Sequence, residues 1–157
     1  MVFGYFEIWS RESKKSSPPP PEIAFGYFVD DFVEKFSNLV FVSSPAFLSR
    51  LDLSLPKIEL NRVFSSGGPL PYAASQDTLL SMACIPVEVY GSTETGGIAY
   101  RQQRSKNARW RLFDGVTLTK KGQSTYLRSP YLKDANPILL DDRIDVLADG
   151  SFELLGR

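Results

Sequence analysis

The sequence contains no histidine and only one cysteine, Cys84. Without histidine the chain lacks the usual general base near neutral pH, the commonest metal ligand and any Ser-His triad. Its chemistry must therefore use carboxylates, backbone amides or a bound cofactor. Cys84 can form no disulfide within the chain, and it lies in the apolar segment LLSMACIPVEV without a basic neighbour. We expect it to be a buried core thiol and not a nucleophile.

Long apolar runs and blocks of like charge are also missing. No stretch of about 18 apolar residues occurs, and the first residues, MVFGYFEIW, lack the basic start and cleavage site of a signal peptide. We expect no membrane span and a cytoplasmic location. Eighteen basic residues balance eighteen acidic ones, so no electrostatic footprint for nucleic acid is present. The 157 residues and 43% apolar content suit one globular domain, or part of a larger one.

Residues 1–28 form an irregular N-terminal segment that contains SRESKKSSPPPPE. Four consecutive prolines cannot enter a helix or a central strand. We expect an exposed connection there. The alternative is a polyproline ligand for another protein domain.

Residues 29–103 alternate between helical and strand patterns. Helices are predicted at VDDFVEKFSNL, SSPAFLSRL and PLPYAASQDTLLSMA, and strands at LVFV, IELNRVFSS and IPVEVY. Ser44 and Pro45 are typical of a helix start, as N-cap and first-turn residue, and Pro71 opens the last helix. This order predicts an α/β unit with parallel strands, whose ligand loops lie at the carboxyl ends of the strands.

Residues 104–157 change to short strands and turns without a helical pattern. WRLFDGVTLTKKGQSTYLRSP carries the turn signals Asp114-Gly115 and Lys121-Gly122. IDVLADGSFELLGR predicts a hairpin around Asp149-Gly150. The α/β unit is therefore expected to be followed by an antiparallel, barrel-like β unit.

Two glycine-rich loops follow predicted strands, VFSSGGPLP at 63–71 and YGSTETGG at 90–97. In a parallel sheet both loops would open on the same edge and line one pocket. Their glycines permit close approach to a ring or a phosphate, and Ser92 and Thr93 supply donors for an anion. Tyr90 offers a face for a base, and Glu94 a hard oxygen ligand for Mg²⁺.

The same residue types are also common in ordinary turns, so the loops alone leave a purely structural interpretation open. GSTETGG is not a Walker A loop, because it lacks the Gly-Lys pair that grips the β and γ phosphates.

YGSTETGG resembles the Tyr-Gly-x-Thr-Glu signature of the adenylate-forming (AMP-binding) superfamily, which contains acyl-CoA synthetases, peptide-synthetase adenylation domains and luciferases. SSGGPLP resembles the adenine-side loop of that family. DDRIDVLADGSFELLGR resembles its third element, in which a ribose-binding Asp precedes an Asp-Gly hairpin and a closing Leu-Gly-Arg. The resemblance covers residues from near 39 to 157. RSP at 128–130 and LLGR favour the fatty- or aryl-acid CoA ligases, and hence fatty acid metabolism.

The resemblance implies a nucleotide-binding role for each matching residue. The residues that would border the adenine are Ser66, Gly67, Gly68 and Pro69. Tyr90 would stack on the base, while Gly91 and Ser92 would leave room for the acyl carboxylate and the α-phosphate. Thr93 would hydrogen-bond that phosphate and Glu94 would hold Mg²⁺, which makes these two the candidate catalytic residues.

The ribose-binding carboxylate is less directly assigned, because the family usually has Thr-Gly-Asp where this chain has Leu140-Asp141-Asp142. Counting back from Gly156-Arg157 across the hairpin places the match at Asp142. A carboxylate can accept both hydroxyls of a cis-diol. Asp141 remains a competitor, and two solvated acids before a hairpin are the structural alternative. Arg157 would approach the ribose or the phosphate.

The implied function is AMP-forming acid-thiol ligation, in which ATP activates a small carboxylic acid to an acyl adenylate and coenzyme A or an acyl-carrier-protein thiol then accepts the acyl group. The family also has an upstream Lys-bearing phosphate loop and a downstream lysine domain, neither of which matches here. We therefore expect a central fragment of the large N-terminal domain, inactive alone and prone to self-associate through an exposed sheet edge. The alternatives are a non-catalytic nucleotide-binding module or an inactive remnant.

Overall fold

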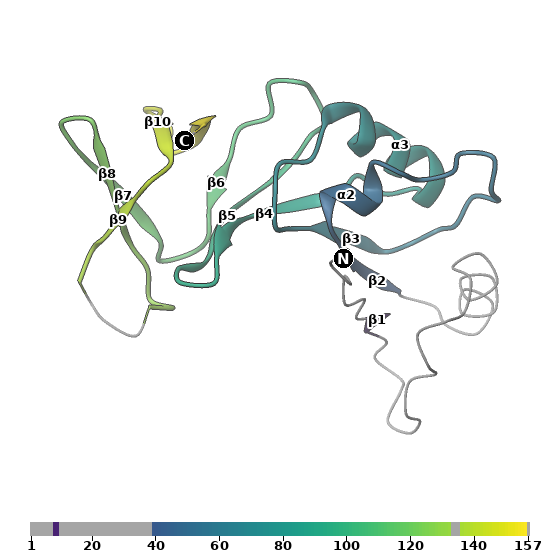
Figure 1. The fold of residues 1–157 in the computed structure, drawn as a ribbon, viewed down its shortest axis with the longest axis horizontal. Coiled ribbons are helices and arrows are strands. Elements are labelled where there is room, and N and C mark those ends of the chain that lie inside the picture. Colours follow the sequence, from purple (N-terminus) through teal and green to yellow (C-terminus); the bar gives the residue numbers. More distant parts are fainter. Residues whose placement is uncertain (1–7, 10–38, 133–135, 157) are drawn as a thin grey trace. The chain divides into compact units, whose positions relative to one another are not determined.

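The computed structural model describes residues 8–9, 39–132 and 136–156 (Figure 1). The chain divides into two compact units. Unit 1 comprises Met1–Ser65 and Pro69–Pro86, and unit 2 comprises Ser66–Gly68 and Val87–Arg157. The Pro/Ser-rich segment and all but the last residue of the helix predicted at VDDFVEKFSNL lie outside the described residues.

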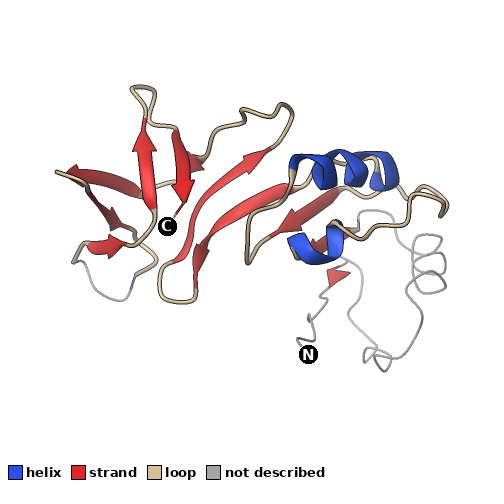
Figure 2. Cartoon of the chain, turned by 45° about the horizontal axis from the view of Figure 1, so that its top comes forward, coloured by secondary structure: helices blue, strands red, loops and turns tan. Residues whose placement is uncertain are grey.

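Unit 1 contains the helices, which are drawn blue in Figure 2. Its elements are β1 (Ile8–Trp9), β2 (Val40–Ser43), α2 (Pro45–Leu48), β3 (Arg62–Ser65) and α3 (Tyr72–Met82). Strand β1 pairs antiparallel with β2, while β2 and β3 pair in parallel from Val40↔Arg62 to Ser43↔Ser65. The parallel strand-helix-strand arrangement predicted for this region is confirmed.

The predicted helix starts are found close to their expected positions. Ser44 caps α2, with its side chain accepting a hydrogen bond from the Phe47 backbone N at 3.3 Å, and Pro45 is the first helical residue. Pro71 lies at the N-cap of α3 in an extended conformation, so this helix begins one residue later, at Tyr72. The Ser44 side chain accepts a hydrogen bond from a first-turn N–H that has no partner in the helix, and proline has no backbone N–H that needs a partner.

The core of unit 1 lies between the helices and the β2–β3 pair. Its buried residues are Phe41, Leu48, Val63, Leu70, Ala74 and Met82. Cys84 packs against this core, as expected of a core thiol, but it is only partly buried. Ala83 ends α3 in a left-handed conformation with φ 52°.

Unit 2 consists of antiparallel strands. They are β4 (Val87–Ser92), β5 (Gly96–Gln102), β6 (Arg111–Leu112), β7 (Thr117–Lys121), β8 (Ser124–Arg128), β9 (Ile138–Leu140), β10 (Arg143–Val146) and β11 (Phe152–Gly156). Within this unit β4, β5 and β6 are neighbours, β7 to β9 form a three-stranded sheet, and β10 pairs with β11. The described residues from 87 to 156 contain no helix, as predicted.

Turn glycines and a common core hold these strands together. Gly122 and Gly150 have φ values of 63° and 79° and close the β7–β8 and β10–β11 turns where the sequence predicted them. The buried core residues are Ile98, Ala99, Trp110, Val116, Leu127, Ile144 and Phe152.

The predicted fold class, a parallel α/β unit followed by antiparallel β structure, is confirmed. The second compact unit begins its long segment at Val87, whereas the sequence pattern changes to short strands and turns near residue 103. The predicted domain bounds at residues 28 and 103 remain predictions. Neither α2 nor α3, the helices of the described chain, is long and apolar enough to cross a membrane.

Candidate functional site

The segment YGSTETGG forms the tip of the antiparallel β4–β5 hairpin. Tyr90 pairs with Ala99, and the register shifts between Tyr90 and Gly91. A Cβ added to Gly91 would lie 2.0 Å from the carbonyl oxygen of Gly96 on the facing strand. No side chain fits there, so the hairpin itself requires glycine at this position, apart from any role in leaving room for a ligand.

The turn of this hairpin is stabilised by reciprocal hydrogen bonds between Ser92 and Thr95. The Ser92 backbone N donates to Thr95 Oγ1 at 3.0 Å, and the Thr95 backbone N donates to Ser92 Oγ at 3.2 Å. Thr95 is only 5% exposed. Sequence reasoning missed Thr95, although a hydroxyl residue three positions after Ser92 is a signal for such a turn.

Tyr90 and Asp142 meet in unit 2 although 52 positions separate them in the sequence. The Tyr90 hydroxyl donates a hydrogen bond of 2.7 Å to Asp142 Oδ2. Asp142 is half-buried, whereas Asp141 is exposed. The structure therefore brings the predicted adenine-stacking ring next to Asp142 and leaves the competing carboxylate in solvent.

The other predicted loop belongs to the same unit only through its middle residues, Ser66 to Gly68. Ser66 Oγ donates to the backbone oxygen of Val89 at 3.3 Å, directly beside Tyr90. Gly67 adopts φ 88°, a conformation that favours glycine. Ser66 to Gly68 belong to unit 2, whereas Pro69 belongs to unit 1. Arg157 lies outside the described residues.

Two aromatic side chains hold the Tyr90 ring. Its centroid lies 5.7 Å from that of Trp110 and 6.0 Å from that of Phe152. Trp110 and Phe152 also exchange backbone hydrogen bonds of 3.0 Å in both directions. Tyr90 thus has a packed orientation, and a base that stacked on it would meet a ring whose position is already determined.

A buried ion pair lies behind this aromatic cluster. Arg101 donates to both carboxylate oxygens of Glu88, at 2.8 and 3.0 Å, and its guanidinium carbon lies 4.4 Å from the Trp110 ring centroid. Glu88 is 1% exposed. Sequence reasoning missed both charged residues, although a glutamate inside the apolar strand segment VEV signals a buried partner.

Glu94 extends from the tip of the hairpin and is fully exposed. Hydrogen bonds from the Ser92 side chain, from its own backbone N–H and from Thr93 lower the pKa of Glu94 below its usual value of 4.5. Thr93 Oγ1 lies 2.9 Å from Glu94 Oε1. The described residues contain no group of three or more His, Cys, Asp or Glu that would enclose a metal ion. One ionised carboxylate suits Mg²⁺, which in nucleotide sites is held largely by phosphates and water.

The chain matches no protein-family model and no curated protein sequence. Solved structures do match. ATP-bound MatB from Rhodopseudomonas palustris has a TM-score of 0.63 at 17% identity, covering 84% of this chain and 33% of MatB. MenE from E. coli, bound to a phenylether-linked analogue of OSB-AMS, has a TM-score of 0.63 at 16% identity, covering 75% of this chain and 30% of MenE.

The anthranilate CoA ligase AuaEII in complex with anthranoyl-AMP matches with a TM-score of 0.54 at 17% identity, covering 75% of this chain and 29% of the ligase. The chain thus spans about a third of the length of the structures it matches. All three are adenylate-forming enzymes. We conclude that this chain has the fold of a segment of the adenylate-forming enzymes.

Proposed function

We propose that unit 2 binds the adenosine and α-phosphate of an acyl adenylate, and that the chain acts as part of an AMP-forming acid-thiol ligase. The contact between Tyr90 and Asp142 carries the proposal. It joins two residues to which the sequence resemblance gives adenine and ribose roles. Neither role follows from fold similarity alone, because function depends on the site.

In this proposal the residues of the hairpin and its neighbours divide the nucleotide between them. Ser66, Gly67 and Gly68 border the adenine edge while Tyr90 stacks on its face. Asp142 accepts the ribose hydroxyls, Thr93 donates to the α-phosphate, and Ser92 leaves room for that phosphate. Glu94 would hold Mg²⁺, which when bound supplies charge stabilisation at the phosphate. Pro69, Gly91 and Arg157 keep the roles that the resemblance implies.

The acid substrate would be a small carboxylic acid, a fatty or aromatic acid by the resemblance. Coenzyme A or a carrier-protein thiol would accept the acyl group. The cytoplasmic location also remains a proposal, as does self-association of the chain.

Titration calorimetry with AMP tests the proposed base stacking. Tyr90→Ala should weaken AMP binding by about 1–3 kcal/mol, the usual contribution of a base-aromatic stack, whereas Tyr90→Phe keeps the ring and should retain most of the affinity. Tyr131→Ala is the control, since Tyr131 is 65% exposed and lies outside the site. Similar losses in Tyr90→Ala and Tyr131→Ala, or no AMP binding to the unaltered chain, would contradict the proposal.

The depressed pKa of Glu94 predicts how its ionisation depends on pH. The carboxylate should stay charged as pH falls through the usual range of a glutamate, and should be protonated only below it. Ser92→Ala removes the largest cause and should move the NMR-detected Glu94 titration upward. Thr93→Val should have a smaller effect in the same direction. Addition of Mg²⁺ should change the NMR chemical shifts of Glu94 only at pH values where its carboxylate is ionised. A Glu94 titration midpoint that Ser92→Ala leaves unchanged would refute this account.

A further inference from the structure

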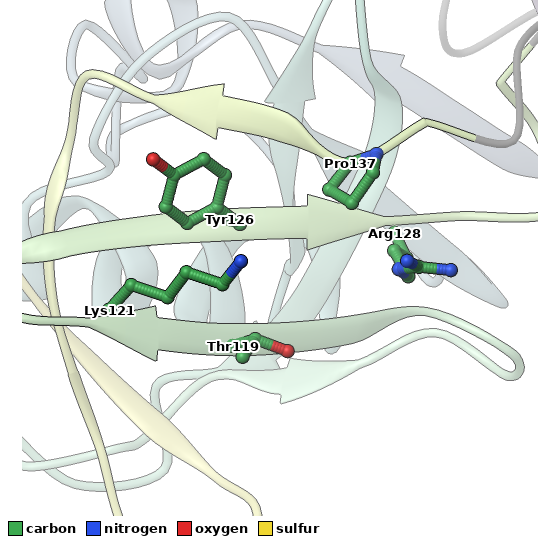
Figure 3. Close-up of a pocket in the computed structure, with 5 residues that line it drawn as sticks. All are labelled: Thr119, Lys121, Tyr126, Arg128 and Pro137. Atoms are coloured by element: carbon green, nitrogen blue, oxygen red, sulfur yellow. The ribbon is translucent and has the colours of Figure 1, made fainter.

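A small pocket of about 120 Å³ lies on the three-stranded sheet formed by β7, β8 and β9 (Figure 3). It shares no residue with the proposed nucleotide site. Its lining residues are Thr119, Lys121, Tyr126, Arg128 and Pro137. Figure 3 shows that these side chains come from neighbouring strands and from the segment that leads into β9.

The pairing register explains why these side chains share one face of the sheet. Thr119 lies opposite Tyr126, and Leu118 lies opposite Leu127. Leu127 is fully buried and Leu118 packs against the same core, so this pair occupies the inner face. Because side chains alternate along a strand, Lys121 and Arg128 lie on the outer face with Thr119 and Tyr126.

The pocket concentrates positive charge, and none of the described residues that line it carries a carboxylate. Lys121 Nζ lies 5.4 Å from the centroid of the Tyr126 ring, which helps to hold the ammonium over this face. Within the described part of the chain, ion pairs engage Arg101, Arg109 and Lys120, and none includes Lys121 or Arg128. Two cations are therefore available to an anionic ligand.

We propose that this pocket, the β7–β9 pocket, binds the phosphate group of a small phosphate ester. Arg128 would present a planar fork to two phosphate oxygens, Lys121 a compact second charge, and Thr119 a hydroxyl donor. Tyr126 and Pro137 would form an apolar wall for the organic part of the ester. Two cations match a phosphate dianion better than a singly charged carboxylate. The inference does not depend on the proposed adenylate site.

NMR titration of the ¹⁵N-labelled full chain with phenyl phosphate tests this assignment. Amide shifts should change at Thr119, Lys121, Tyr126 and Arg128. Lys121→Gln and Arg128→Gln should each raise the Kd about tenfold, because each removes a charge-assisted hydrogen bond. Arg111→Gln removes one exposed charge of the same unit, on β6, and should leave the Kd nearly unchanged.

Binding of two further ligands, and the set of residues whose amide chemical shifts change, test what the pocket recognises. Benzoate should bind more weakly than phenyl phosphate, since it offers one charge to two cations. Inorganic phosphate should also bind more weakly, because it lacks the part that contacts Tyr126 and Pro137. Equal binding of benzoate or of inorganic phosphate would overturn the assignment to a phosphate ester. Shifts confined to other residues, an equal loss in Arg111→Gln, or no shift at about 10 mM phenyl phosphate would overturn the site itself.

Discussion

Arg101→Met should lower the free energy of unfolding of unit 2 by about 3–5 kcal/mol. The substitution leaves the Glu88 carboxylate, whose side chain is 2% exposed, without the guanidinium that contacts both of its oxygens. It also removes the cation over Trp110. A buried charge that loses its counter-ion regains little hydration in exchange, which is why this loss exceeds the stabilisation that an intact ion pair provides.

Arg109→Met is the matched control for this prediction. Arg109 forms an ion pair with Glu153 at 3.6 Å in which both side chains are 50% exposed, so its loss should cost less than about 1 kcal/mol. The double variant Glu88→Leu/Arg101→Met should recover much of the stability, because it removes both charges. Urea unfolding should be followed by tryptophan fluorescence in a Trp9→Phe background. Trp9 and Trp110 are the two tryptophans of the chain, so the signal then comes from Trp110 alone. Equal effects of Arg101→Met and Arg109→Met would contradict the buried-pair account.

Asp142→Ala should weaken binding of AMP, or of a non-reactive acyl-adenylate analogue, by about 1.5–3 kcal/mol, or roughly ten- to a hundredfold. In the proposed site the variant loses a charged acceptor for the two ribose hydroxyls. Asp142 is already held by the Tyr90 hydroxyl at 2.7 Å, so its position is set before the nucleotide arrives. Titration calorimetry measures the loss directly.

Asp141→Ala changes the net charge by the same amount and should have a much smaller effect. Asp141 is exposed, whereas Asp142 is half-buried against Tyr90. A general electrostatic effect of removing one acid would change the affinity for AMP equally in both variants. A difference in affinity between them would therefore report the ribose contact. Unfolding of both proteins should be measured in parallel, since Asp142→Ala also removes the bond from Tyr90. A larger loss of affinity in Asp141→Ala would overturn the assignment of the ribose carboxylate.

Local sequence signals predicted most of the described secondary structure. Ser44 and Pro45 begin a helix because a hydroxyl acceptor and a residue without an N–H suit the unpaired first turn. Gly122 and Gly150 close hairpins because the turns need positive φ. These signals depend only on residues a few positions apart, so they can be read without knowledge of the fold.

The candidate site was only partly predictable. The resemblance of YGSTETGG identified Tyr90 and Glu94 as candidates, but the glycine-rich tip is a hairpin between antiparallel strands, where Gly91 has a steric reason to be glycine. Glu88 and Arg101 were not predicted as a pair. They are 13 positions apart, which matches no local helical or turn spacing, and the pairing of β4 with β5 places them opposite each other.

The sequence by itself determined the order of the elements and the positions of turns and caps, and it predicted candidate residues for binding an anion or a base. Those properties arise from backbone preferences and short-range hydrogen bonds, which neighbouring residues control. Only the tertiary structure decided that Asp142 and not Asp141 contacts Tyr90, and that Lys121 and Arg128 share one face of a sheet. Strand register set the second outcome, because a shift of one residue between β7 and β8 would turn the side chains of one strand to the opposite face.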